Sequence, residues 1–160
     1  MKLKYMALAA LAMLVPALCF GKSSSKTLVF GDVTLEPEDS LMFSLEDMDE
    51  TIGGLPVLDE YLPAGIEVEW TGKKFKTPKS GKVKYSKKEG DFVTTNDDNP
   101  CGFKVSISKK TGKVSGSFKV YVAKSEKKLK SYTAKFSGYL GSEGFVVTIK
   151  KVGSYVATFE

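Results

Sequence analysis

Apolar and polar residues alternate along residues 65–160. Segments such as "IEVEW", "FKVSIS" and "KVSGSFKVYVA" place apolar side chains at alternate positions, which is the period of a β-strand with one buried face. Runs rich in Gly, Ser, Thr and Lys separate these segments, and such runs are typical of tight turns. The pattern predicts consecutive strands joined by hairpins, which is an antiparallel meander.

The predicted fold class is therefore all-β. A flat meander of this length would leave its apolar face in water, so we expect a curled sheet, a sandwich or a small barrel. Gly116 takes an apolar position of "KVSGSFKVYVA". A glycine inside a strand indicates a bulge, a bend or the close approach of another group.

The preceding residues are less regular. "TLVFGDVTLEP" predicts two short strands joined by a glycine turn. Leu41, Phe43 and Leu45 alternate as in a strand, whereas "SLEDMDE" could begin a helix. "GGLPVLDEYLPAG" is rich in turn residues and has room for one helical turn. These features predict an acidic N-terminal segment over 22–62, followed by a lysine-rich β-domain over 63–160.

Charge is distributed unevenly along the chain. Residues 22–69 hold 2 lysines and 12 acids, whereas residues 70–160 hold 20 lysines and 7 acids. The lysines fall within the strand patterns rather than in one block, so we interpret them as a solvated face. A binding site for a polyanion is the alternative. The acidic run at 46–50 could bind calcium, form a solvated loop or face the lysine-rich half.

The first residues have the pattern of a secretory signal peptide over 1–21. Lys2 and Lys4 precede the apolar run "YMALAALAMLVPALCF", and the residues up to Gly21 suit cleavage after it. We therefore expect a secreted, periplasmic or cell-surface protein without an integral membrane span after cleavage. A retained membrane helix and a lipoprotein acylated at Cys19 are the alternatives.

The charged residues are unusual in kind, because all 24 residues of the Lys and Arg class are lysine and histidine is absent. Without histidine the chain has no Ser-His or Cys-His nucleophile pair and no imidazole metal ligand. Without arginine it lacks the bidentate group that binds phosphate and carboxylate. We expect no enzyme activity, no cofactor, no metal site and no nucleic-acid partner.

The stretch "TTNDDNPCGF" contains Cys101, the only cysteine beyond the leader. Its Asp and Asn residues miss the spacing of a calcium loop, because Pro100 occupies a ligand position. We predict a turn that leads into a core strand through Phe103. Cys101 has no histidine to activate it, so we interpret it as a half-buried structural thiol, with an intermolecular disulfide as the alternative.

Two aromatic residues and two glutamates are candidate contacts for a ligand. Trp70 and Tyr121 could form a sugar-stacking surface, and Tyr121 alternates with the apolar positions around it. We expect most of the other aromatic residues in the core. Glu67 and Glu69 lie two apart on one strand face, where they could form a glycosidase pair. Solvated surface glutamates explain the same pattern.

The blocks "LPAGIEVEW", "SGKVKY", "NPCGFKVSI", "TGKVSGSFKVY" and "KLKSYTAKFSG" follow one another in order through residues 62–160. Together they resemble a β-rich C-terminal module of secreted bacterial proteins. The resemblance implies an extracellular β-module, and it implies neither an activity nor a functional residue.

These features predict a secreted, non-catalytic β-module with a binding or structural role at the cell envelope. Its partner would be a cell-surface polymer or another envelope protein. Three alternatives stay open: a carbohydrate-binding module that uses exposed aromatics, a hydrolase with paired carboxylates, and an outer-membrane β-barrel.

Overall fold

The computed structural model describes residues 26–160, so the predicted leader and its cleavage position lie outside the described residues. The described part consists of strands, turns and loops with one 3-10 turn, which confirms the all-β prediction. Among residues 26–160, no helix is long and apolar enough to cross a membrane.

The described residues form strands that are mostly short and follow one another closely. The first seven strands are β1 (Leu28–Phe30), β2 (Val33–Leu35), β3 (Ser40–Glu46), β4 (Thr51–Ile52), β5 (Leu55–Pro56), β6 (Ala64–Trp70) and β7 (Phe75–Lys76). The others are β8 (Val83–Ser86), β9 (Asp91–Thr94), β10 (Lys104–Ile107), β11 (Lys113–Ala123), β12 (Leu129–Tyr139), β13 (Phe145–Ile149) and β14 (Gly153–Phe159). The 3-10 turn spans Asp59–Tyr61 and confirms the helical turn expected there.

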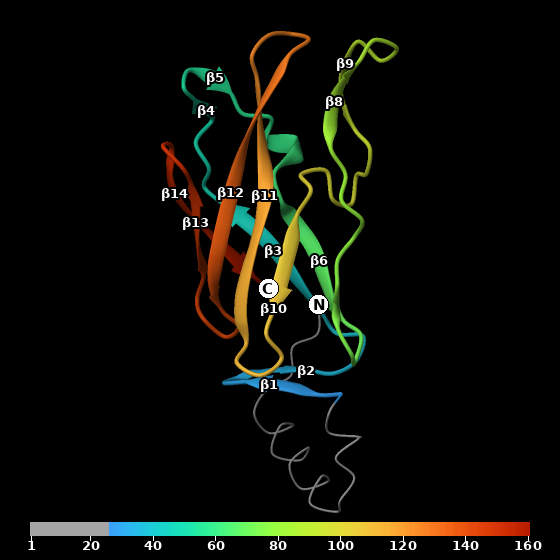
Figure 1. The fold of residues 1–160 in the computed structure, drawn as a ribbon, viewed down its shortest axis with the longest axis vertical. Helices are drawn as coiled ribbons and strands as arrows, with labels where there is room; N and C mark the ends of the chain where they lie inside the picture. Colours follow the sequence, from blue (N-terminus) through green and yellow to red (C-terminus); the bar gives the residue numbers. More distant parts are fainter. Residues whose placement is uncertain (1–25) are drawn as a thin grey trace, which may run out of the picture.

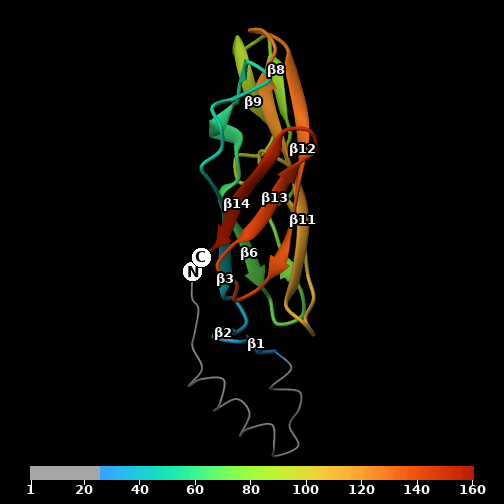
Figure 2. The same cartoon turned by 90° about the vertical axis from the view of Figure 1, so that its left-hand side faces the viewer.

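Eight of these strands form one antiparallel sheet in the order β10-β11-β12-β13-β14-β3-β6-β7. The sheet curls until it is nearly closed into a barrel, as two views of the ribbon show (Figures 1 and 2). The strands from β10 to β14 are neighbours in chain order, so the predicted meander is confirmed. The hairpins β1-β2, β4-β5 and β8-β9 form small separate sheets.

Strand β3 places the acidic N-terminal segment inside the main sheet. It pairs with β14 on one side, where Phe43 faces Phe159, and with β6 on the other, where Phe43 faces Ile66. The division near residue 62 is therefore one of composition and charge, and it does not separate two folding units. The helix considered for "SLEDMDE" does not form, because its first residues continue β3.

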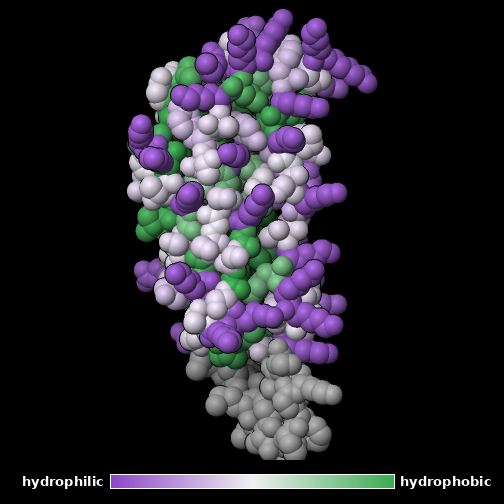
Figure 3. Space-filling model, viewed as in Figure 1, coloured by the Kyte–Doolittle hydropathy of each residue, from purple (hydrophilic) through white to green (hydrophobic). Residues whose placement is uncertain are grey.

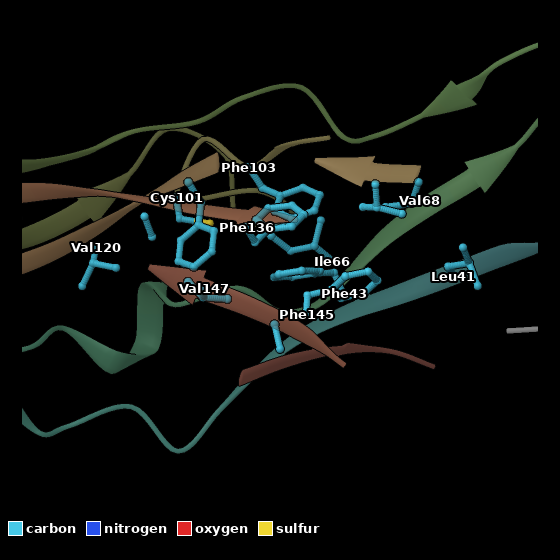
Figure 4. Packing of buried hydrophobic residues seen from close by; sticks show 14 of the residues in the cluster. Leu41, Phe43, Ile66, Val68, Cys101, Phe103, Val120, Phe136, Phe145 and Val147 are labelled. Atoms are coloured by element: carbon cyan, nitrogen blue, oxygen red, sulfur yellow. The ribbon is translucent and has the colours of Figure 1, made fainter. Parts of the chain in front are cut away.

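Phenylalanine rings fill the centre of the barrel. Phe43 is completely buried, and its ring centroid lies 4.6 Å from that of Phe136 and 4.7 Å from that of Phe103. Phe118, Phe145 and Phe159 also contact the Phe43 ring. Figure 4 shows this packing, in which side chains from opposite walls of the barrel meet. The apolar face of the meander is therefore buried by the curling of the sheet onto itself.

The β1-β2 hairpin lies across one end of the barrel (Figure 1). Leu28 and Leu35 of this hairpin are buried in the main core. Just before the hairpin, the carbonyl oxygen of Lys26 accepts a hydrogen bond from Trp70 Nε1. The start of the described chain is thus fixed to the end of β6.

The β8-β9 hairpin packs against the outer side of β11, near the C-terminal end of that strand. Val83 of β8 and Phe92 of β9 form a second apolar cluster with Tyr121 of β11. The neighbours of Tyr121 in the sequence, Val120 and Val122, belong to the main core. This end of β11 is therefore covered on both sides, whereas Lys113, Ser115 and Lys119 earlier in the strand are exposed.

Candidate functional site

The outer face of strands β10 to β13 carries a regular array of lysine and hydroxyl side chains. Two neighbouring rows of cross-strand partners run across all four strands. The first row contains Lys104, Ser117, Lys135 and Thr148. The second row contains Ser106, Ser115, Ser137 and Val146. These rows lie side by side because outward positions repeat every second residue along a strand.

Two further lysines border the rows. Lys119 faces Thr133 across β11 and β12, and its Nζ donates a hydrogen bond of 2.6 Å to Thr133 Oγ1. Lys113 faces Tyr139 at the other end of the same pair of strands. We use the name Lys/Ser/Thr face for the set of Lys104, Ser106, Lys113, Ser115, Ser117, Lys119, Thr133, Lys135, Ser137 and Thr148. Over β11 and β12 the space-filling view shows pale residues with purple side chains between them (Figure 3).

The Lys/Ser/Thr face is positively charged without internal neutralisation. Within the described strands β10 to β13, no residue is Asp or Glu. Neighbouring strands lie about 4.8 Å apart, so Lys104 and Lys135, two strands apart in one row, are separated by about 10 Å. Ammonium groups at such spacing repel one another and attract anions. The hydroxyls between them can both donate and accept hydrogen bonds.

An aromatic ring stands at the border of this face. Tyr139 ends β12, and 54% of its surface is exposed. Val146 and Val156, cross-strand partners on β13 and β14, are also exposed. The cationic face therefore has an apolar edge on which a flat ring could stack.

Trp70 is buried and cannot contact a ligand. The prediction that it forms part of a sugar-stacking surface is therefore wrong. Only 1% of its surface is exposed, and its ring packs 5.0 Å from that of Phe75. Its indole nitrogen is already bonded to the Lys26 carbonyl. Trp70 is a core residue because the inward positions of β6 all meet the barrel interior.

Tyr121 is also buried, and the expectation that it lies on the open face is wrong. It does point away from the main core, but the β8-β9 hairpin covers it and leaves 8% of its surface exposed. Its hydroxyl accepts a hydrogen bond of 3.4 Å from the Val83 nitrogen. Tyr121 therefore anchors a hairpin and offers no stacking surface.

The loop around Cys101 is a turn, as its sequence predicts, and Asn99 organises it. Asn99 is completely buried. Its Nδ2 donates to the carbonyl oxygens of Pro78 and Phe103, each at 3.0 Å. Its Oδ1 accepts a hydrogen bond of 2.7 Å from the Phe103 nitrogen. Phe103 enters the core directly after this turn.

Cys101 is a structural thiol that is more deeply buried than expected. Its side chain has no exposed surface and it forms no disulfide within the described chain. Burial raises the pKa of the thiol to about 12, because the thiolate cannot be solvated in an apolar core. This placement argues against the intermolecular disulfide considered for Cys101, since a partner thiol could not reach the sulfur.

We expect Cys101 in the folded protein to resist alkylation by iodoacetamide at pH 8, where the raised pKa leaves almost no thiolate. Unfolding in urea at the same pH should restore rapid labelling, and mass spectrometry follows both reactions. A folded protein that is labelled at the rate of the unfolded one, or that runs as a dimer dissolved by reductant, would contradict this placement.

The raised pKa of Cys101 can also be tested through the pH dependence of protein stability. The folded thiol keeps its proton from pH 8.5 to about 12, whereas the unfolded thiol loses it above about pH 8.5. Stability linked to Cys101 is therefore present below pH 8.5 and lost as the pH rises toward 12. The stability difference between the wild type and Cys101→Ala should shrink over that range in denaturant titrations.

Glu67 and Glu69 line a shallow depression rather than an apolar-walled cleft. The depression measures about 180 Å³, and Lys76, Thr77 and Pro78 complete its lining. Glu67 is exposed and its Oε1 accepts a hydrogen bond of 2.7 Å from Ser40 Oγ. The enclosed carboxylate pair that a hydrolase would need is not formed by these two residues.

Glu46 ends β3, and the other acids of the run, Asp47, Asp49 and Glu50, lie in the connection to β4. Asp49 Oδ2 accepts a hydrogen bond of 3.1 Å from the Tyr155 hydroxyl. Among the side chains that the structure describes, no group of three or more acids, cysteines and histidines could hold a metal ion.

The sequence predicts a solvated lysine face, with a polyanion site as the alternative, but it does not tell which lysines and hydroxyls lie together. The polar positions of "FKVSIS" and "KVSGSFKVYVA" hold only Lys, Ser and Tyr. Each strand alone looks like an ordinary solvated face. The array emerges only when the register sets lysines of one strand beside hydroxyls of the next.

The class that the fold and this face define is a small antiparallel β-barrel-like protein with one cationic, hydroxyl-rich side. No protein-family model matches the sequence, and neither a curated protein nor a solved structure matches it.

Proposed function

We propose that this protein is an exported, non-catalytic module that binds an acidic polysaccharide at the cell surface through its Lys/Ser/Thr face. The observation that carries the proposal is that four exposed lysines lie among hydroxyls on one face of strands that contain no Asp or Glu. Export itself rests on the leader predicted over 1–21.

The shape and charge of the face favour a polymer over a small ligand. Lys104, Lys113, Lys119 and Lys135 are all exposed, and they are distributed over three strands. A single small anion could reach only one or two of them. A chain with regularly spaced carboxylates or sulfates could contact several at once, so that weak exposed ion pairs add up.

The hydroxyls and Tyr139 favour a sugar polymer among the possible polyanions. Serine and threonine hydroxyls can exchange hydrogen bonds with sugar hydroxyls. Tyr139, with 54% of its surface exposed, could stack on the face of a sugar ring. A carbohydrate-binding role on Trp70 and Tyr121 loses its basis, because both rings are buried.

The experiment compares two variants that each lose four lysines. The face variant carries Lys104→Gln, Lys113→Gln, Lys119→Gln and Lys135→Gln. The matched control carries Lys82→Gln, Lys84→Gln, Lys87→Gln and Lys88→Gln, all exposed on or beside the β8-β9 hairpin. We expect wild type and control to bind immobilised polygalacturonate, and the face variant to bind at least about tenfold more weakly.

Salt and a neutral polymer complete the test. Raising the ionic strength from about 0.05 M to about 0.5 M should weaken wild-type binding, because exposed charges are screened. A neutral glucan should not bind. Equal loss of affinity in both variants would show that net charge alone acts, and tight binding of the neutral glucan would refute the ionic mechanism.

A further inference from the structure

A hollow of about 510 Å³ lies where the β4-β5 hairpin, the start of β12 and the β13-β14 turn come together. It is separate from the depression at Glu67 and from the Lys/Ser/Thr face. Its lining is mostly polar. Its polar lining includes Asp49, Thr51, Lys130, Tyr132, Lys150 and Lys151.

Three of the lining residues are lysines, and they come from two separate elements. Lys130 is the second residue of β12, and its Nζ lies 5.0 Å from the centroid of the Tyr132 ring. Lys150 and Lys151 form the turn after β13. Lys151 has a φ of 66°, in the left-handed region that few non-glycine residues adopt. The turn thus holds two adjacent ammonium groups at the hollow where β12 supplies a third.

The single acid in the lining does not balance these charges. Asp49 accepts a hydrogen bond of 3.1 Å from the Tyr155 hydroxyl. Burial, together with this contact, raises the pKa of Tyr155, so the phenol stays protonated and keeps donating to Asp49. Three lysines against one carboxylate leave an excess of positive charge in a concave site, where the potential is focused.

We propose that this hollow binds a small ligand of about the size of a sugar that carries a phosphate group. An anion with two negative charges would relieve the repulsion among Lys130, Lys150 and Lys151, and lysine binds such groups as a mobile point charge. The hollow is large enough for a sugar-sized molecule. Tyr132 and Thr51 supply hydroxyls for the uncharged part of the ligand.

This site goes beyond the proposed polymer binding, because it uses none of the residues of the Lys/Ser/Thr face. On β12, Lys130 and Tyr132 share the side of the strand that carries Ala134 and Phe136, which are buried in the barrel core. The hollow therefore continues the interior of the barrel at its end, whereas Lys135 and Ser137 point outward. The two proposals can fail independently.

The test is a titration of the ¹⁵N-labelled full protein, followed by amide chemical shifts. The probes are inorganic phosphate, a hexose 6-phosphate and the unphosphorylated hexose. We expect saturable shifts at Thr51, Gly53 and Val152 with the hexose phosphate, weaker binding of phosphate, and no saturation with the free hexose.

Matched variants decide which lysines act. The pocket variant carries Lys130→Gln, Lys150→Gln and Lys151→Asn, and asparagine is chosen because it tolerates the left-handed backbone. We expect it to bind the hexose phosphate at least about tenfold more weakly, while the face variant described above binds as the wild type does. An unchanged dispersion of amide shifts shows that the pocket variant is folded.

Three results would overturn the proposal. The first is the absence of saturable shifts in the wild type with either phosphate probe. The second is undiminished binding in the folded pocket variant. The third is an equal loss of affinity in the face variant. That result would show that the anion is attracted by the overall positive charge of the protein and not by the hollow.

Discussion

Replacing Gly116 with alanine is expected to lower the free energy of unfolding by about 3 kcal/mol, the upper end of the usual cost of overpacking. Gly116 lies in β11 opposite Val105 of β10 and Phe136 of β12. An added Cβ would lie 2.2 Å from the Lys104 carbonyl oxygen and 2.4 Å from Phe136 Cζ. The first of these is a backbone atom, so the β10-β11 pairing itself must shift. Urea unfolding followed by circular dichroism measures the loss.

Gly153→Ala is the matched control for this prediction. Gly153 is also in a strand of the main sheet, and its added Cβ would come no closer than 3.6 Å, to the Tyr155 hydroxyl. That is an ordinary contact, and the lower entropy of the unfolded chain could even stabilise the variant by about 0.4–1 kcal/mol. If both variants unfolded at the same urea concentration, the Phe136 ring could not lie over Gly116 as it does here.

The strands from β10 to β14 could be predicted from the sequence because their signals are local. The alternation in "KVSGSFKVYVA" marks the whole of β11 (Lys113–Ala123). Of the bulge, bend or close approach that Gly116 indicates, the structure shows a close approach, by the Lys104 carbonyl oxygen and the ring of Phe136. The turn before Phe103 was predictable for the same reason, since Asn99 bonds to the backbone of Phe103, four residues away.

The environment of the candidate aromatics could not be predicted, because it depends on contacts distant in the sequence. Tyr121 alternates with Val120 and Val122 and so looks exposed. Its cover comes from Val83 and Phe92 of a separate hairpin. Period-two alternation tells which side of a strand a residue occupies, and it does not tell what packs on that side.

The position of the acidic segment is a second long-range feature. The local pattern around Leu41, Phe43 and Leu45 is compatible with both a strand and the start of a helix. The segment forms a strand because it pairs with β14 and β6. The pairing of β3 with β14 thereby joins residues that are far apart in the chain, such as Phe43 and Phe159. Closing so long a loop costs entropy, and the aromatic packing around Phe43 offsets this cost.

Phe43→Ala is therefore expected to cost about 3–5 kcal/mol of stability, the range for removing a buried phenylalanine ring. Phe43 contacts the rings of five other phenylalanines, which come from β11, β12, β13, β14 and the loop before β10. Removing it leaves a cavity at the point where the N-terminal strand joins the meander. Urea unfolding monitored by circular dichroism, and by Trp70 fluorescence in parallel, tests both the size of the loss and whether the two probes still coincide.

Met42→Ala is the control, because Met42 neighbours Phe43 on β3 and is not fully buried. It alters the same strand without removing a ring from the aromatic centre, so its cost should stay well below that of Phe43→Ala. If Phe43→Ala cost no more than Met42→Ala, the barrel would not depend on β3 for its core. The acidic segment would then be an attachment to the lysine-rich sheet, and the central place of β3 in the common core would have to be rejected.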